Sequence, residues 1–380
     1  MTFQICWLSF SVFVGAAIYS SGLTSVKEEF SISEVAAILG LTVFVAGNGF
    51  GVMLFSPLTE LPHLGRNPVY LGTLFLFMVL QVPTALSIDL GMLLAFRFIT
   101  GFVGAPPLAA GGASMNDMYP PHKRAYAISW WDIAALCGPC KFAYQRPNCS
   151  QYTYTLVGVG PLLSGFAVQA KDWRWSIWIL MWLAAVSLVF HLCFLPETFE
   201  ANILYRRACR LRKLTGNERL KSRGEIEYAQ QSLNHVAYET LVRPFTLNLE
   251  PIIFSLNLYT SLIYALLYMW LESFSLVFED VYGMNTGVEG LTFLGLLVGA
   301  LMVTPLLFWH IRTCLEPRFN EKGEICPEDR LLTAEVGGFF IPICLFIFGW
   351  TSRTSVHWIV PIIGSAFFGV ASQLLYVSLS

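Results

Sequence analysis

Charge is what this 380-residue sequence has least of. Only 13% of its residues are Asp, Glu, Lys or Arg, whereas soluble domains carry roughly 25%. Stretches 69–88, 174–190 and 251–271 contain almost no acid or base, and each can supply the ~20 residues that a helix needs to cross a bilayer. Since the chain has many such stretches and no β-barrel pattern, helices are the expected spanning structures. The sequence therefore predicts an all-α integral membrane protein.

The sequence also lacks the residue patterns of several function classes. The six histidines are dispersed, and no metal-ligand cluster, phosphate loop or Ser/His/Asp arrangement is recognisable, so no enzyme, metal or cofactor is predicted. No basic face with interleaved aromatic residues indicates nucleic acid. Cys137 and Cys140 have the spacing of a redox pair, but no strand precedes them. Residues 3–22 lack a preceding basic region, which favours a first span over a signal peptide.

Ten apolar segments are predicted to span the membrane. Lys and Arg concentrate in alternate loops, which puts those loops and both chain ends in the cytoplasm. The polar segment 197–250 divides six spans from four, the layout of a two-bundle transporter: an N-terminal six-helix bundle over 1–196, a cytoplasmic linker, and a C-terminal bundle over 251–380. The expected spans are 4–22, 34–56, 69–88, 90–113, 126–139 resuming at 157–169, 174–195, 252–278, 287–309, 336–351 and 358–378.

The loop after the second span combines glycines with charge. Gly47, Gly49 and Gly51 precede Ser56–Glu60, and Gly65–Pro68 follows. A tight turn at Gly65 would hold Glu60 and Arg66 against neighbouring helix ends, as a charge latch that breaks when the bundles rock. An ordinary cytoplasmic loop explains Arg66 but not the ordered glutamate and glycines, so we favour the latch.

Arg97 is a cation inside an otherwise uncharged span. Such residues are costly in a membrane and usually face the protein interior or a cavity. Gly101 and Gly104 would let a neighbouring helix approach closely. The alternative is that Arg97 extends to the outer surface from near the start of its helix.

The seventh span carries a second ionisable group. Tyr264, Tyr268 and Glu272 recur at a spacing of four and so share one helix face. An intramembrane carboxylate is a candidate proton relay, although Glu272 could instead touch lipid headgroups. Phe274 and the tyrosines could form an aromatic wall for planar compounds, or could simply pack. Asp132 in the fifth span is a weaker candidate, close to the cytoplasmic entrance.

These segments resemble the major facilitator superfamily, in particular its fungal-type drug:proton antiporters of the multidrug- and benomyl-resistance kind. Further matching patches are Asp172–Trp175, Leu195–Thr198 and Leu271–Phe274, and the resemblance covers nearly the whole chain. It implies a major-facilitator-type two-bundle fold of six plus six spans. It also implies a monomer in the plasma membrane that exports small amphipathic drugs in exchange for protons by alternating access. The implied partners are the small-molecule substrate, protons and the lipid bilayer, and the resemblance links Arg97 to proton coupling.

The chain departs from that family pattern in two places. The antiporter motif of the fifth span is divided between Gly138, Pro139 and Gly160, Pro161, Gly165. Residues 140–156 between these parts are predicted to be an insertion, and codons compatible with splice sites suggest a retained intron. The sequence also ends in the tenth span, where the family has two more. The alternative function is therefore a truncated or mis-spliced transporter product that transports nothing.

Overall fold

The computed structural model describes residues 1–20, 22–137, 171–230, 238, 242–284, 292, 294–320 and 325–379, and every regular element in these ranges is a helix. Nine of these helical segments are long and apolar enough to cross a membrane. This confirms the predicted all-α membrane fold. The interrupted span at 126–139 and 157–169 coincides in its first part with α7 (Pro121–Cys137), and its second part lies outside the described residues.

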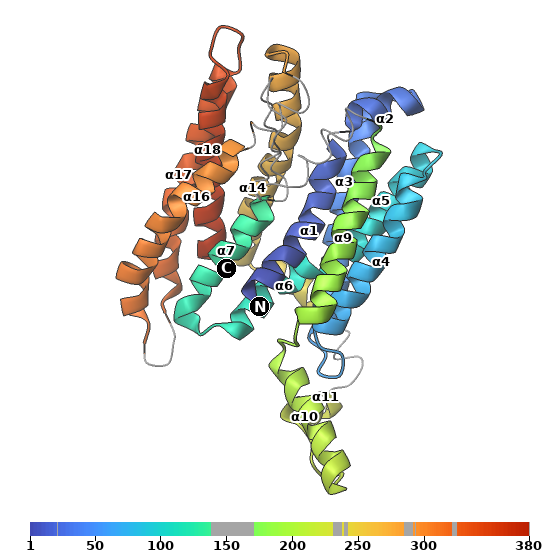
Figure 1. Cartoon of the computed structure of the whole chain (residues 1–380). Helices are drawn as coiled ribbons and strands as arrows, with labels where there is room; N and C mark the ends of the chain where they lie inside the picture. The colour runs from blue at the N-terminus through green and yellow to red at the C-terminus, as the bar shows by residue number, and fades with distance from the viewer. Residues whose placement is uncertain are drawn as a thin grey trace, which may run out of the picture.

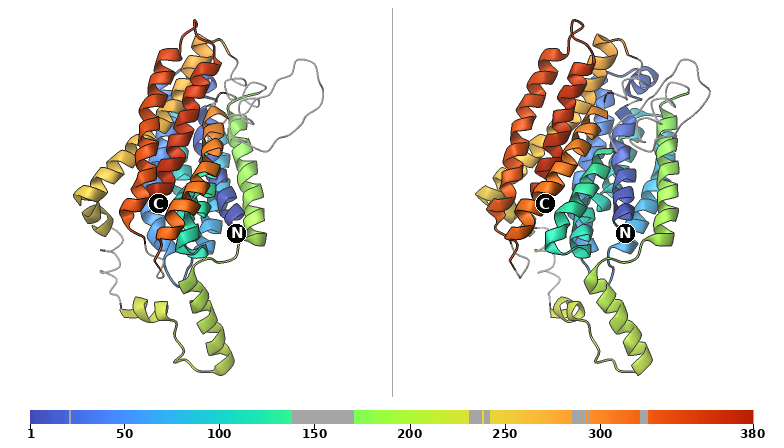
Figure 2. Two further views of the ribbon diagram at one scale, coloured as in Figure 1. Left: turned by 90° about the vertical axis from the view of Figure 1, so that its left-hand side faces the viewer. Right: turned by 60° about the vertical axis from the view of Figure 1, so that its left-hand side comes forward.

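The helices form two groups, with α7 between them (Figures 1 and 2). In the first group, α1 contacts α3, α6, α7 and α9 and is largely buried, so it forms the centre of this half. The first group consists of α1 (Thr2–Ser20), α2 (Leu23–Phe30), α3 (Glu34–Thr59), α4 (Asn67–Ala85), α5 (Leu90–Gly104), α6 (Pro106–Met118) and α9 (Arg174–Phe194).

The predicted fourth span is two helices rather than one. Pro106 and Pro107 have no backbone N–H, so they cannot donate the hydrogen bonds that would continue α5. The chain instead breaks at Ala105, and α6 begins with both prolines in its first turn, the position in a helix where proline is tolerated. Together α5 and α6 form one apolar stretch, Leu90–Met118, that is long enough to cross a membrane, and Ser114 and Asp117 lie near the end of α6.

The second group contains fewer helices among the described residues. α18 packs along both α16 and α17, and it also contacts α7. α17 begins at Pro327, nine residues before the predicted start of its span at 336. The hydrophobic pattern does not reveal these residues, because the first turns of the helix are polar and carry Glu328 and Asp329. The group consists of α14 (Pro251–Ser275) with its π-helical extension Leu276–Val281, α16 (Leu294–His310), α17 (Pro327–Thr351) and α18 (Ile359–Leu379).

The polar linker is partly helical, and its helices α10 and α11 project away from both groups (Figure 1). It contains α10 (Glu200–Thr215), α11 (Arg223–Gln230) and α13 (Arg243–Asn248). α10 ends at Gly216, whose φ of 65° is a left-handed conformation that favours glycine. The Arg212 side chain then donates to both carboxylate oxygens of Glu225, at 3.0 and 3.1 Å, and so joins α10 to α11.

Candidate functional site

Gly65 shapes the turn between α3 and α4. Its φ of 77° lies in the left-handed region, and a β-carbon there would come within 2.5 Å of Glu197 Oε2. Glycine is therefore required both for the backbone conformation and for the close approach of Glu197. The turn delivers Arg66 to the start of α4, buried to 4% exposure.

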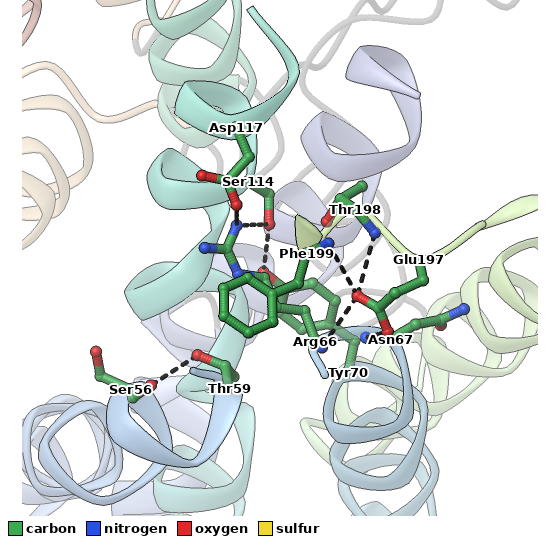
Figure 3. Close-up of polar contacts among 10 residues, drawn as sticks. All are labelled: Ser56, Thr59, Arg66, Asn67, Tyr70, Ser114, Asp117, Glu197, Thr198 and Phe199. Carbon is green, nitrogen blue, oxygen red and sulfur yellow. Dashed lines mark hydrogen bonds and ion pairs between the residues drawn. The ribbon is translucent and has the colours of Figure 1, made fainter. Parts of the chain in front are cut away.

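The Arg66 side chain joins this turn to α6 (Figure 3). Its Nη1 atom lies 2.9 Å from Asp117 Oδ2 and donates to Ser114 Oγ at 3.1 Å. Tyr70 shares the same serine hydroxyl at 3.0 Å, and the guanidinium lies 5.3 Å from the ring centre of Phe199. We call Arg66, Asn67, Ser114, Asp117 and Glu197 the Arg66 cluster.

Glu197 holds the other side of the cluster. Its carboxylate accepts hydrogen bonds from the backbone N–H groups of Arg66 at 3.1 Å and Asn67 at 3.2 Å. It also accepts from Thr198 at 3.1 Å and Phe199 at 3.2 Å. A negative group at a helix start satisfies amides that have no partner inside the helix and interacts favourably with the helix dipole. Glu197 thereby fastens the chain leaving α9 to the beginning of α4.

The sequence-predicted latch residues are thus only partly brought together. Gly65 and Arg66 belong to one cluster, whereas Glu60 is exposed at the end of α3 and takes no part in that cluster's hydrogen bonds and ion pairs. Sequence reasoning missed Asp117 altogether. It noted Glu197 only as part of the Leu195–Thr198 patch that resembles the family. All members of the cluster lie in the first helix group and the chain that leaves it.

Arg97 is buried at 0% exposure between α5, α1 and α3. Its Nη1 donates to the Gly15 carbonyl at 3.0 Å, and its Nε donates to the Gly40 carbonyl at 3.4 Å. The rings of Tyr19 and Phe44 lie 4.4 and 4.8 Å from the guanidinium carbon. Neutral carbonyls and π faces therefore surround the charge, an arrangement that suits arginine better than lysine.

The predicted aromatic face of α14 divides into two environments. Tyr264 and Tyr268 are half-buried, and Tyr268 packs against the core of the first helix group. Phe274 is fully buried, with ring centres 5.3 Å from Phe278 and 5.5 Å from Phe348. Glu272 lies in α14, but its side chain is outside the described part of the structure, as are the motif residues Gly138, Pro139, Gly160, Pro161 and Gly165.

α7, α14 and α18 meet where the two helix groups join, and we call this region the seam. Gln373 of α18 donates from Nε2 to the Ser129 carbonyl of α7 at 3.1 Å. The rings of Trp131 and Tyr376 are 5.6 Å apart, and Trp131 Nε1 donates to Ser9 Oγ of α1 at 2.7 Å. Asp132 of α7 is also buried in the seam, which sequence reasoning had placed near the cytoplasmic entrance.

The two groups also touch at the end of α7 that begins at Pro121. Tyr126 donates to Glu316 Oε1 at 3.1 Å, and its ring centre lies 5.0 Å from that of Phe308. A cavity of about 80 Å³ lies beside these contacts, and His122, Arg124, Leu307 and Phe319 are among its lining residues. Within the described ranges, no group of three or more His, Cys, Asp or Glu side chains is arranged to hold a metal ion.

The Major Facilitator Superfamily profile matches residues 5–140 and 154–380. The unmatched residues 141–153 fall inside the segment 140–156 that the sequence predicts to be an insertion. Transporter mfs1 of Schizosaccharomyces pombe is 42% identical over 381 residues, covering 100% of this chain and 68% of its own length. The cycloheximide resistance protein of Candida maltosa is 35% identical over 385 residues, covering 99% of this chain and 66% of its own length. The chain thus spans about two-thirds of the length of these relatives.

The fold agrees with this match. The xylose transporter XylE from E. coli, in a partially occluded inward-open conformation, superimposes with a TM-score of 0.62 at 15% identity, covering 100% of this chain and 82% of that one. At this identity the similarity concerns the fold alone. The profile covers most of the sequence, and the apolar helices make the chain a multi-pass membrane protein. The chain therefore belongs to the Major Facilitator Superfamily, whose members are transporters and not enzymes.

Proposed function

We propose that this protein exports small amphipathic compounds from the cell in exchange for protons, as a monomer in the plasma membrane. The observation that carries the proposal is the seam, where aromatic and ionisable side chains of both helix groups meet at membrane depth. The name of the Candida maltosa relative, a cycloheximide resistance protein, supports export of a toxic small molecule.

Alternating access is the proposed mechanism. Transporters of this architecture bind substrate near the membrane midplane, between two bundles that rock about the site. Tyr268 packs against the core of the first helix group, and Tyr264 lies one turn before it in α14. The rings of both tyrosines suit flat amphipathic molecules. Glu272, one helical turn beyond Tyr268, is the proposed proton carrier, and Arg97 is proposed to tune the coupling through the packing of α1, α3 and α5.

The Arg66 cluster is proposed to act as the cytoplasmic latch. It fastens α4, α6 and the exit of α9 to one another, so the first helix group can rotate as a unit. Its ion pair is buried on the arginine side and more open on the aspartate side. Rearrangement at Asp117 during rocking would therefore change the balance between conformations.

Glu272→Gln is expected to abolish proton-driven efflux, because glutamine cannot release the proton that the exchange requires. The measurement is efflux of a fluorescent drug from vesicles with an imposed pH gradient. Detergent-purified variant should remain monodisperse, which separates loss of coupling from loss of folding. Unchanged efflux by a correctly folded Glu272→Gln variant would exclude this residue as carrier.

Deleting residues 140–156 is expected to raise the yield of folded protein and its efflux. The segment contains Lys141 and Arg146, and two cations at mid-span would cost several kcal/mol on membrane-insertion scales. The gap in the family match at 141–153 favours this interpretation, and with it the alternative that the chain as written is an inactive transporter product. Equal yield and equal drug resistance of both forms in a transporter-deficient host would contradict the prediction.

A further inference from the structure

Asp132 is a buried carboxylate that no contact in the described structure neutralises. Asp132 is 5% exposed, and its Oδ2 atom has no hydrogen-bond partner among the described residues. It stands 11 residues after the start of α7, about 16 Å along the helix axis and so close to half the ~30 Å thickness of a bilayer core. A polar group at that depth requires a partner.

Among the described residues, the helices around Asp132 place no basic side chain at its level. α1, α14 and α18 contain no lysine, arginine or histidine. Within α7, the nearest is Arg124, eight residues away and about 12 Å along the axis, where it donates to the Tyr119 carbonyl. In α16, which also packs on α7, the basic residue is His310 at the helix end. An ion pair with a residue of these helices therefore does not explain the aspartate.

Aromatic groups supply the surroundings instead. Tyr264 and Tyr376 interact through their side chains, and the Asp132 carboxyl acts electrostatically on both. Tyr268 and Trp131 complete the aromatic side of the seam. Aromatic faces attract organic cations, and a carboxylate among them adds the opposite charge. The same carboxyl group can otherwise be neutralised by a proton.

We infer that Asp132 is an exchange site, at which a proton and the positive group of an organic cation compete for one carboxylate. Binding is written as Asp132–COOH plus cation giving Asp132–COO⁻ paired with the cation, while the proton passes to water. The site lies between α7 and the two helices α14 and α18 of the second group. The bound proton or cation therefore changes the contacts between the helix groups. The inference rests on the proposed function and names its substrate class, lipophilic organic cations.

The test adds tetraphenylphosphonium to the full chain in detergent with little buffer, and follows binding by calorimetry and proton release by an indicator dye. The wild-type chain is expected to release protons as the cation saturates it. Asp132→Asn is expected to bind the cation roughly tenfold or more weakly, because a charge-assisted contact is lost, and to release clearly fewer protons than wild type. Neutral triphenylphosphine oxide should bind wild type and variant within about twofold, since it has no charge to pair.

Asp280→Asn is the matched control. It makes the same change at an exposed acid in the π-helical extension of α14, and is expected to behave as wild type. Wild-type binding and proton release by a monodisperse Asp132→Asn variant would overturn the inference.

A second measurement needs no variant. Dicyclohexylcarbodiimide, which modifies protonated carboxyl groups in apolar surroundings, is expected to label Asp132 in the wild-type chain, and tetraphenylphosphonium to protect it. Absence of label at Asp132, or label that the cation does not reduce, contradicts the exchange site. Neither measurement uses a gradient. Failed efflux with intact exchange therefore counts against the proposed function alone, and intact efflux without exchange counts against this site alone.

Discussion

Arg66→Ala is expected to destabilise the chain by about 2 kcal/mol, because it leaves Asp117 without its ion pair and removes one of the two hydrogen-bond partners of Ser114. Removing one partner of a fully buried pair costs about 3–5 kcal/mol. The smaller figure applies here because the Asp117 side chain is 34% exposed and water compensates part of its charge. The measurement is thermal unfolding in detergent, followed by intrinsic fluorescence and by the fraction that stays monodisperse.

Arg206→Ala is the matched control for that variant. Arg206 lies 3.8 Å from Glu197, but its side chain is 47% exposed, so its removal should change stability by less than about 0.5 kcal/mol. Arg66→Lys should fall between the two, because an ammonium keeps the charge but lacks the fork that reaches Asp117 and Ser114 together. If Arg66→Ala and Arg206→Ala unfold at the same temperature, the Arg66 cluster does not stabilise this end of the protein.

Gly47→Ala is expected to cost about 1–3 kcal/mol, the usual penalty for forcing extra atoms into a packed interface. A β-carbon at Gly47 would lie 2.3 Å from the Phe98 carbonyl oxygen, and one at Gly51 would lie 2.2 Å from that of Phe102. Both contacts are to backbone, which cannot rotate away as a side chain can. α3 and α5 would therefore have to move apart. The resulting loss of stability is measured by thermal unfolding in detergent.

Gly49→Ala tests the same chemistry in the same helix without the contact. Nothing lies within 4 Å of a β-carbon at Gly49, which is exposed. Alanine is favoured over glycine in helices by up to about 1 kcal/mol, so this variant should be as stable as wild type or slightly more stable. Equal losses for Gly47→Ala and Gly49→Ala would mean that helix propensity, and not the α3–α5 contact, sets the stability.

Most of the fold could be predicted because the membrane imposes a simple rule on sequence. A run of about 20 apolar residues must form a helix if its backbone is to be hydrogen-bonded in lipid. The rule does not locate the ends of helices or the interruptions within them. It did not reveal the interruption at Ala105, although Pro106 and Pro107 marked it, and it started α17 too late because the first turns of that helix are polar.

The site could be predicted less well, because partners distant in sequence carry no signal of their own. Arg97 was recognised as buried from its cost in a membrane, but the carbonyl groups of Gly15 and Gly40 that hold it belong to the backbone and are invisible in sequence. The predicted latch held Glu60 and Arg66 against neighbouring helix ends without naming their partners, and the structure places Asp117 and Glu197 beside Arg66. Nothing local in the sequence identifies these two distant residues.

Asp132 illustrates a related limit. The sequence places Asp132 in the first half of the predicted fifth span, which suggested a position close to the cytoplasmic entrance. Helix geometry carries it two to three turns deeper, into the seam. By contrast, the spacing of Tyr264 and Tyr268 correctly indicated a shared face, since helix periodicity is a local property of sequence.

The contacts of Arg97 determine how the voltage across the membrane acts on this protein. Carbonyls and rings leave its full positive charge in place, and guanidinium does not deprotonate in proteins. Voltage across a membrane acts on such a charge with about 2.3 kcal/mol per 100 mV for the whole field. If a rocking movement shifts Arg97 through about a tenth of that field, the step gains or loses about 0.2 kcal/mol per 100 mV. The turnover of this protein would then respond to electrical potential even when the exchange itself moves no net charge.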